Sequence, residues 1–226
     1  AKDALQVLKR YELEEQVPNS ILETLESKSL LLETRQQAAG LQDVQNIIIG
    51  DNKLAALAAL NQAKQEGFQA EILTNELQGE AREVGRDLAR RLRVDSSTRT
   101  HPFCWIAGGE TTVTLKGNGK GGRNQELALA AVTELAGLPD VLLIALATDG
   151  DDGPTDAAGA VVTGDSARRA ESLGLQVTRH LARNDAYPFF AALGDLLKTG
   201  PTGTNVNDLI FLFAFEQKNA FRQDDL

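Results

Sequence analysis

The stretch VQNIIIGDNKLAALAALNQAKQEGFQAEILTNEL, residues 44–77, changes its pattern twice along its length. It begins with an apolar run, turns at Gly50 and Asp51, continues as an Ala-rich helical pattern that Gly67 ends, and closes on a second run with β-branched residues. Strand, helix and strand in this order predict a βαβ unit, because a crossover helix joins neighbouring parallel strands. The sequence therefore predicts an α/β fold with a parallel sheet at this point.

Helical patterns also precede this unit. Residues 3–13 and 20–27 carry apolar side chains at helical spacing, and Asn19 or Ser20 is suited to cap the second of these helices. The segment 31–43 has weak periodicity, which predicts a connection.

On the other side, the pattern predicts a helix over 79–92, followed by the polar stretch 93–102 without an apolar period. We place a domain boundary near residues 95–102, which divides the chain into domains 1–98 and 99–226.

The second domain is predicted to be α/β with a mixed sheet. Residues 103–117 read as a strand, a Gly-Gly turn and an alternating strand, which is typical of a hairpin. A helix is expected over 124–137, a fully buried strand over 141–148, and a further strand over 208–215.

Composition limits the classes of partner. The 226 residues carry a formal charge of −9, which argues against a nucleic-acid surface because binding phosphates along a duplex requires a basic face. The single cysteine cannot form an internal disulfide, and no apolar run approaches the roughly 18 residues of a membrane helix. No secretory h-region is visible near the start, so we expect a cytoplasmic protein without membrane partners. The absence of methionine fits a chain that begins inside a longer protein, or one whose initiator was removed.

A glycine-rich loop precedes the helix expected at 124–137. Gly117, Gly119 and Gly122 spell G-x-G-x-x-G, which fits a dinucleotide-binding turn, a phosphate cradle or a flexible surface turn. The strand expected before the loop alternates polar and apolar residues, and the acid that a dinucleotide fold needs arrives late, at Asp149. The dinucleotide match is therefore weak.

Three cations in the same loop favour an anion site. Lys116, Lys120 and Arg123 lie within eight positions of an acidic chain, and arginine offers a planar fork for bidentate phosphate contacts. Backbone N–H groups at a helix N-terminus add partial positive charge, and glycines would leave those groups free for a ligand.

Two polar segments at predicted strand ends could complete such a site. Four aspartates follow the strand 141–148, namely Asp149, Asp151, Asp152 and Asp156, and carboxylates there could hold Mg²⁺ beside a polyphosphate. The alternative is ordinary turn chemistry, with Asp156 as a helix cap. The segment 199–209 (TGPTGTNVNDL) could orient a polar ligand or bond its own backbone.

Four motifs together resemble one family. Residues 108–129, 148–160, 184–190 and 199–209 (GGETTVTLKGNGKGGRNQELAL, TDGDDGPTDAAGA, NDAYPFF and TGPTGTNVNDL) are similar to the C-terminal MOFRL domain of the glycerate 2-kinases, whose members were often labelled hydroxypyruvate reductases. Residues 47–85 resemble the later half of that family's Rossmann-like N-terminal domain. The resemblance implies two α/β domains, a partial Rossmann-like domain (1–98) and a mixed-sheet MOFRL domain (99–226).

The function that the resemblance implies is ATP-dependent phosphorylation of D-glycerate to 2-phosphoglycerate in a cleft between the two domains. ATP and Mg²⁺ would be the cofactors, glycerate and nucleotide the small-molecule partners, and a homodimer is an open option. Family members are about twice as long, and the glycine-rich and lysine motifs of their early N-terminal domain have no counterpart in this chain. We therefore expect the chain alone to be inactive.

The resemblance also implies roles for individual residues. Arg123 would contact the transferring phosphoryl group or the substrate carboxylate, and Lys120 would supply a second positive charge. Asp149 and Asp152 are the predicted Mg²⁺ ligands. Residues predicted to bind phosphate or substrate are Glu110, which would orient the substrate hydroxyl, Gly121 and Gly122, which would allow close backbone approach, and Asn124, Thr202 and Asn205.

Two other functions stay open at this point. An NAD(P)H-dependent hydroxypyruvate reductase would use residues 117–122 for the pyrophosphate of its cofactor. A non-catalytic protein that binds small anions would need only the local cations.

Overall fold

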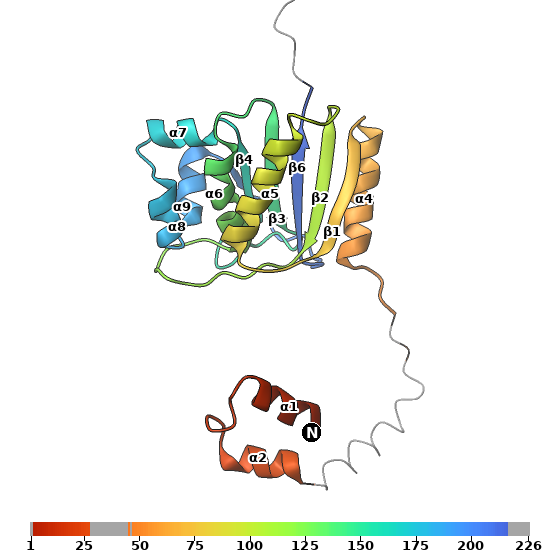
Figure 1. Ribbon diagram of the computed structural model, residues 1–226, viewed down its shortest axis with the longest axis vertical. Coiled ribbons are helices and arrows are strands. Elements are labelled where there is room, and N and C mark those ends of the chain that lie inside the picture. The colour runs from red at the N-terminus through yellow and green to blue at the C-terminus, as the bar shows by residue number, and fades with distance from the viewer. Residues whose placement is uncertain (1, 28–44, 46, 217–226) are drawn as a thin grey trace, which may run out of the picture. The chain divides into compact units, whose positions relative to one another are not determined.

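The computed structural model describes residues 2–27, 45 and 47–216, and the chain forms two compact units, Ala1–Ile49 and Gly50–Leu226 (Figure 1). The first unit contains α1 (Lys2–Arg10) and α2 (Asn19–Glu26), which confirms both helices predicted there. Pro18, not Asn19 or Ser20, is the N-cap residue of α2, because the helix begins at Asn19 and both polar residues are already helical. The connection predicted at 31–43 lies outside the described residues.

The second unit is built on one six-stranded mixed sheet with the strand order β1-β2-β6-β3-β4-β5. Its strands are β1 (Gln69–Leu77), β2 (Phe103–Gly109), β3 (Val141–Ala147), β4 (Gly159–Thr163), β5 (Leu196–Leu197) and β6 (Asp208–Ala214). β1 and β2 are parallel, whereas β6 runs antiparallel to both of its neighbours, β2 and β3. The predicted α/β class and mixed sheet are confirmed.

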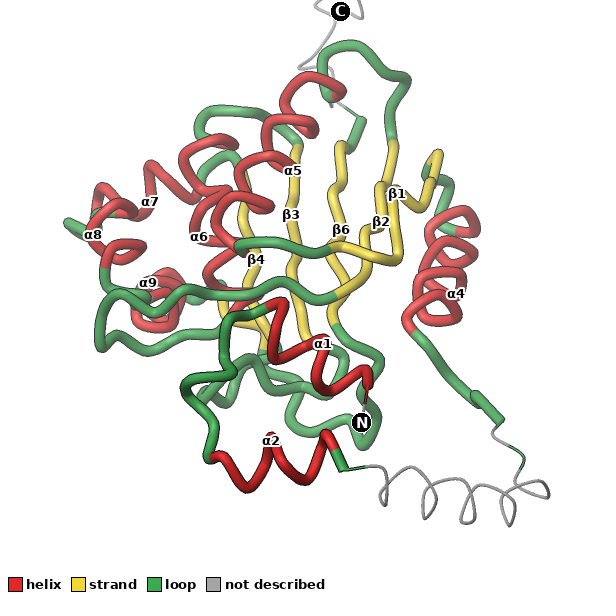
Figure 2. The backbone as a smooth tube through the Cα atoms, turned by 60° about the horizontal axis from the view of Figure 1, so that its bottom comes forward, coloured by secondary structure: helices red, strands yellow, loops and turns green. Residues whose placement is uncertain are grey.

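The two faces of this sheet are covered unequally. One face carries α5 (Ala81–Asp95), α6 (Arg123–Leu135), α7 (Ser166–Ser172), α8 (Val177–Ala182) and α9 (Ala186–Leu193), and the main core lies beneath them. α4 (Asn52–Gln65) packs on the other face, over a smaller core that includes Cys104 and Ile106 (Figure 2). β3 therefore alternates between buried and half-buried residues, and the prediction of a fully buried strand is wrong.

The parallel crossover lies one element later than predicted. Residues 45 and 47–49 form no strand, and Ile47, Ile48 and Ile49 are 70%, 78% and 94% exposed. A strand requires a pairing partner, and no strand of the described chain pairs with these residues. The crossover unit is instead β1-α5-β2.

The hairpin predicted at residues 103–117 does not form. β2 is paired on both edges, since Trp105 lies opposite Glu71 of β1 and Leu212 of β6. No edge of β2 is left for residues 110–117, of which only Thr112 forms an isolated bridge, with Glu80.

The segment 95–102, predicted as a domain boundary, connects α5 to β2 inside the second unit. β1 and β2 are neighbours in the sheet, and α5 packs closely on α6. The approach of these helices requires Gly85, because a Cβ atom there would lie 2.2 Å from the carbonyl oxygen of Leu127. Residues 69–95 therefore share a core with the segment that begins at residue 103.

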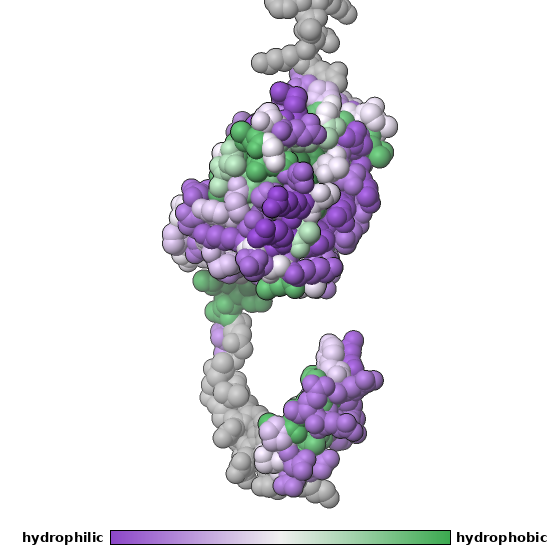
Figure 3. Space-filling view, turned by 90° about the vertical axis from the view of Figure 1, so that its left-hand side faces the viewer, coloured by the Kyte–Doolittle hydropathy of each residue, from purple (hydrophilic) through white to green (hydrophobic). Residues whose placement is uncertain are grey.

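The surface on the side of α7, α8 and α9 is mostly hydrophilic (Figure 3). Of these short helices, α9 directs Phe189 and Phe190 into the core, where both residues are fully buried. Within the described residues, no helix is both long and apolar enough to cross a membrane.

Candidate active site

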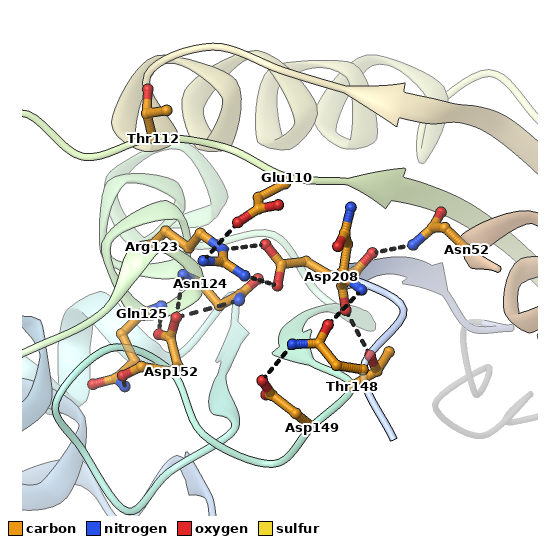
Figure 4. Close-up of polar contacts among 12 residues, drawn as sticks. Asn52, Glu110, Thr112, Arg123, Asn124, Gln125, Thr148, Asp149, Asp152 and Asp208 are labelled. Carbon is orange, nitrogen blue, oxygen red and sulfur yellow. Dashed lines mark hydrogen bonds and ion pairs between the residues drawn. The ribbon is translucent and has the colours of Figure 1, made fainter. Parts of the chain in front are cut away.

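The predicted site residues lie at one edge of the sheet. In the strand register, Leu77, Gly109, Asp208 and Ala147 are aligned across β1, β2, β6 and β3. The chain leaves β2 at Glu110 and β3 at Thr148, and it enters β6 at Asp208, so these residues are brought together (Figure 4). Ligands of open α/β sheets bind at the carboxyl ends of strands.

Arg123 is held between two carboxylates at the start of α6. Its Nε and Nη2 donate to Asp208 Oδ2 and Oδ1 at 2.6 and 3.0 Å, and its Nη1 lies 3.1 Å from Glu110 Oε1. The Asp208 side chain is 2% exposed, the Arg123 side chain 30% and the Glu110 side chain 51%. The hydrogen bond that Arg123 donates to Asp208 raises the pKa of Arg123, so the guanidinium is charged at every physiological pH.

The first half of the glycine-rich loop is fastened to the chain by Asn184. This residue is 5% exposed, and its Oδ1 accepts hydrogen bonds from the backbone N–H groups of Lys116 and Gly117 at 2.7 and 3.0 Å. Its Nδ2 donates to Thr114 O and to Glu126 Oε1, both at 3.3 Å. These N–H groups are directed at the protein rather than at a ligand.

The next part of the loop is bonded in the same way. Gly119 N donates to Arg183 O and Lys120 N to Asp185 Oδ1, both at 2.9 Å. The backbone N–H groups of residues 116, 117, 119 and 120 are therefore bonded within the protein. The N–H groups of residues 121–123 have no hydrogen-bond acceptor within the described chain, and these three residues line a pocket.

The glycines of the G-x-G-x-x-G pattern serve close packing. A Cβ atom on Gly117 would lie 2.5 Å from the backbone of Arg183, and one on Gly119 would lie 2.5 Å from Asp185 Cβ. A Cβ atom on Gly122 would lie 2.3 Å from the carboxyl carbon of Asp152. The spacing that resembles a dinucleotide motif is thus explained by contacts within the protein.

Asp152 caps α6 from a separate loop. The side chain is 1% exposed and accepts hydrogen bonds from Asn124 N at 3.1 Å, Asn124 Nδ2 at 3.3 Å and Gln125 N at 2.8 Å. Burial raises the pKa of Asp152 to about 6, although these hydrogen bonds oppose the change. Both oxygens of this predicted metal ligand, and the backbone N–H of Asn124, are thus already engaged within the protein.

Asp149 joins the two polar loops of the site. Its Oδ2 accepts a hydrogen bond from Asn205 Nδ2 at 2.8 Å, and its backbone oxygen accepts one from Thr202 N at 3.0 Å. Thr202 Oγ1 also donates to Thr148 O at 2.6 Å. In the described residues, no group of three or more His, Cys, Asp or Glu side chains is arranged to hold a metal ion.

Lys120 lies in a separate cluster. Its Nζ is 4.2 Å from the centroid of the Tyr187 ring, an arrangement that favours a cation. The hydroxyl of Tyr187 donates to Asp156 Oδ1 at 2.6 Å, and Lys198 Nζ donates to Asp156 Oδ2 at 3.0 Å. The hydrogen bond from Tyr187, followed by that from Lys198, lowers the pKa of Asp156 to about 2. Asp156 therefore anchors this cluster and does not cap a helix.

A pocket of about 680 Å³ lies beside Arg123, a size within the range of small-molecule sites. Glu110 and Arg123 line its charged side, and Val113, Leu115 and Pro154 contribute apolar surface. A second hollow of about 550 Å³, lined by residues 75–79, 109–112 and 207, shares Glu110 with it. Glu110 therefore stands where the two hollows meet.

Sequence reasoning did not assign Asp208, Asn184 or Glu126 to the site. Asp208 and Asn184 belong to the quoted motifs of residues 199–209 and 184–190, so the motifs were visible but the roles were not. Glu126 is buried and pairs with Arg82, and burial raises its pKa. The only sequence signal for Glu126 is its place in the first turn of the helix that follows the glycine-rich loop.

Comparison with known proteins shows that the part of the chain containing this edge is similar to a known family. Residues 103–208 match the model of the MOFRL family, and this range contains the glycine-rich loop, the loop after β3 and Asp208. This MOFRL segment covers slightly less than half of the chain. The MOFRL segment thus includes every predicted site residue, from Glu110 to Asn205.

Beyond the MOFRL segment, the similarity extends over nearly the whole chain. D-glycerate 2-kinase of Thermotoga maritima is 43% identical, over 93% of this chain and 49% of that protein, and glycerate 2-kinase of Pyrococcus horikoshii is 38% identical, over 92% and 48%. A solved structure of glycerate kinase from T. maritima has a TM-score of 0.77 at 41% identity, covering 94% of this chain and 50% of that one. The chain spans about half the length of these relatives, and the predicted resemblance to glycerate 2-kinases is confirmed.

Proposed function

We propose that this chain supplies one wall of the active site of a glycerate 2-kinase, which transfers a phosphoryl group from ATP to D-glycerate and yields 2-phosphoglycerate. The supporting observation is the charged guanidinium of Arg123, held at the N-terminus of α6 in the 680 Å³ pocket and next to the N–H groups of residues 121–123. The similarity to proteins named glycerate kinase over more than nine-tenths of the chain points to the substrate.

Phosphoryl transfer depends on positioning and on neutralising the charge that develops on the transferred group. Arg123 would contact that group or the substrate carboxylate, and the N–H groups of Gly121 and Gly122 would donate to the same oxygens. Lys120 would add a second positive charge only after its ammonium group left the Tyr187 ring. Asn124 and Asp152 would support the site by holding the first turn of α6.

ATP would enter with Mg²⁺, which bridges phosphate oxygens and neutralises their charge. Asp149 fits this ion best, because it is half-buried at the end of β3 and its position is fixed by Asn205 and Thr202. Asp152 fits it less well, because it is almost completely buried and its carboxylate already accepts three hydrogen bonds from the first turn of α6.

The cellular compartment and the oligomeric state of the enzyme are also proposals. A buried free cysteine and an acidic composition are compatible with the cytoplasm. A homodimer is compatible with the partly exposed phenylalanines of β6, Phe211 and Phe213, and with Phe215 beside them. Sedimentation of the purified protein at several concentrations tests the dimer.

The test of the activity is ADP formation with D-glycerate and Mg-ATP, measured on the complete reading frame that contains this chain. Arg123→Ala should lower turnover on the order of a thousandfold, the scale for loss of a transition-state arginine. The 226-residue chain alone should not turn over, because the alignment of reactants between two walls can contribute about 7–11 kcal/mol to lowering a barrier. Near-normal turnover of the variant would remove Arg123 from the mechanism.

The reductase alternative is tested beside it by NADH oxidation with hydroxypyruvate. The structure offers it little support, because the backbone N–H groups of Gly117 and Gly119, which would bind the pyrophosphate, already donate to Asn184 Oδ1 and Arg183 O. Hydroxypyruvate-dependent NADH oxidation without ADP formation would replace the kinase proposal.

A further inference from the structure

The two carboxylates that contact Arg123 differ in how firmly each is held. Asp208 is the first residue of β6, lies between Gly109 and Ala147 in the strand register, and is almost completely buried. Its backbone oxygen also accepts a hydrogen bond from Asn52 Nδ2 at 2.9 Å. Its carboxylate therefore has a position that the sheet determines.

Glu110 is held much less firmly. Its backbone N–H donates to Leu77 O at 2.8 Å, but in the described chain its carboxylate contacts only Arg123. The side chain is 51% exposed and lies where the two hollows meet. An exposed ion pair of this kind stabilises a protein very little, because water and salt screen it.

The guanidinium is divided between these partners. The edge formed by Nε and Nη2 donates to Asp208, as a bidentate pair with the geometry of a strong charge-assisted contact. Nη1 faces Glu110 (Figure 4), and both residues line the pocket. Removing Asp208 would leave a partly buried cation without its main partner, whereas removing Glu110 would expose a donor to the pocket.

We propose that Asp208 is a positioning residue that fixes Arg123, and that Glu110 is an exchangeable counter-ion on Nη1. In this role Glu110 occupies the place of an anionic oxygen of the ligand, from a phosphoryl or carboxylate group, and is displaced when the ligand binds. The identity of that ligand rests on the proposed function, but the exchange itself concerns any small oxyanion. Glu110 then lowers anion affinity, which differs from the predicted role of orienting a substrate hydroxyl.

Inorganic phosphate is the probe, titrated into the 226-residue chain at low ionic strength and followed by NMR. Glu110→Gln should bind phosphate about three to ten times more tightly than wild type, with the gain decreasing as salt is added. The matched control is Glu76→Gln, which removes one negative charge from the lining of the second hollow without touching Arg123. The control should change affinity less than about twofold.

Asp208→Asn should weaken phosphate binding about tenfold or more, because the amide nitrogen would face a guanidinium donor. Arg123→Ala should remove the effect of Glu110→Gln, which a double-mutant cycle measures. A readout that needs no Asp208 variant is the Nε–H of Arg123 in wild type, which should stay protected from exchange at saturating phosphate.

The proposal is overturned if Glu110→Gln binds phosphate no more tightly than Glu76→Gln, or if phosphate deprotects the Arg123 Nε–H. It is also overturned if folded Asp208→Asn binds phosphate like wild type. Equal phosphate affinity of wild type and Arg123→Ala would count against both this proposal and the proposed function. The three results above overturn this proposal alone, so the two failures are distinguishable.

Discussion

Replacing Asn184 should loosen the glycine-rich loop and lower the free energy of unfolding by a predictable amount. Four hydrogen bonds of its side chain are lost, to Lys116, Gly117, Thr114 and Glu126. A hydrogen bond contributes about 0.5–1.5 kcal/mol net. Water can replace the bonds to the exposed loop residues, and two of the four bonds are long, so we expect a loss of about 2–3 kcal/mol for Asn184→Gly.

The backbone of Asn184 provides a second, separable contribution. Its φ is +53°, a left-handed conformation that glycine and asparagine tolerate but alanine does not. Asn184→Ala should therefore cost about 1–2 kcal/mol more than Asn184→Gly. This order reverses the usual one, in which alanine is the milder substitution.

Urea denaturation measures both differences, and hydrogen exchange shows where the change occurs. The amides of Lys116 and Gly117 should lose protection in Asn184→Gly, whereas the core amides of α6 should keep theirs up to the lower global stability. Asn118→Gly is the matched control, because Asn118 is exposed in the same loop, and it should cost about 1 kcal/mol or less. Stability of Asn184→Gly equal to that of the control, with both amides still protected, would refute the anchoring role.

Three further outcomes follow from buried groups. Because burial raises the pKa of Asp152 from 3.8 to about 6, the folded state binds this proton more tightly than the unfolded state. The stability that proton binding to Asp152 contributes is complete below pH 3.8 and is lost as pH rises through about 6. The free energy of unfolding of wild type minus that of Asp152→Asn should therefore fall by about 3 kcal/mol from pH 3.5 to 7. A constant difference in urea denaturation contradicts this. A Cβ atom on Gly108 would lie 1.9 Å from Asn52 Oδ1, so Gly108→Ala should cost about 1–3 kcal/mol, and at least about 1 kcal/mol less in an Asn52→Ala background. Cys104 is completely buried and its pKa is raised to about 12 by burial, so a thiol reagent should react at the rate of unfolding, and rapid labelling of the native protein would contradict this.

The helices and strands with a long periodic pattern were predictable from the sequence, whereas the pairing of the strands in the sheet was not. The helices α4, α5 and α6 and the strands β1, β2, β3 and β6 follow from runs of apolar residues that carry their own period. The hairpin after Gly109 was wrong because the partner of β2 is β6, about a hundred residues further along the chain. β4 and the helices α7 to α9 are only five to eight residues long, too short for a clear periodic signal.

The sequence predicted which types of residue form the site, but not which of them contact one another. Arg123 was identified because it is a cation at the start of a helix, and the structure places it in a pocket. The role of Asp208 depends on the placement of β6 beside β2, which no local pattern contains. Asp152 was predicted as a metal ligand because sequence shows a carboxylate but not which donors already occupy its oxygens.

The central position of β6 has a consequence for synthesis on the ribosome. β2 and β3 do not pair with each other, so the sheet consists of two halves until residues 208–214 join them. During translation those halves are complete before β6 emerges, and each presents an unpaired edge that invites association with other chains. Because Asp208 arrives with β6, the guanidinium of Arg123 gains its fixed partner in the same event that closes the sheet. A nascent chain therefore cannot hold this arginine in its binding geometry before it has folded.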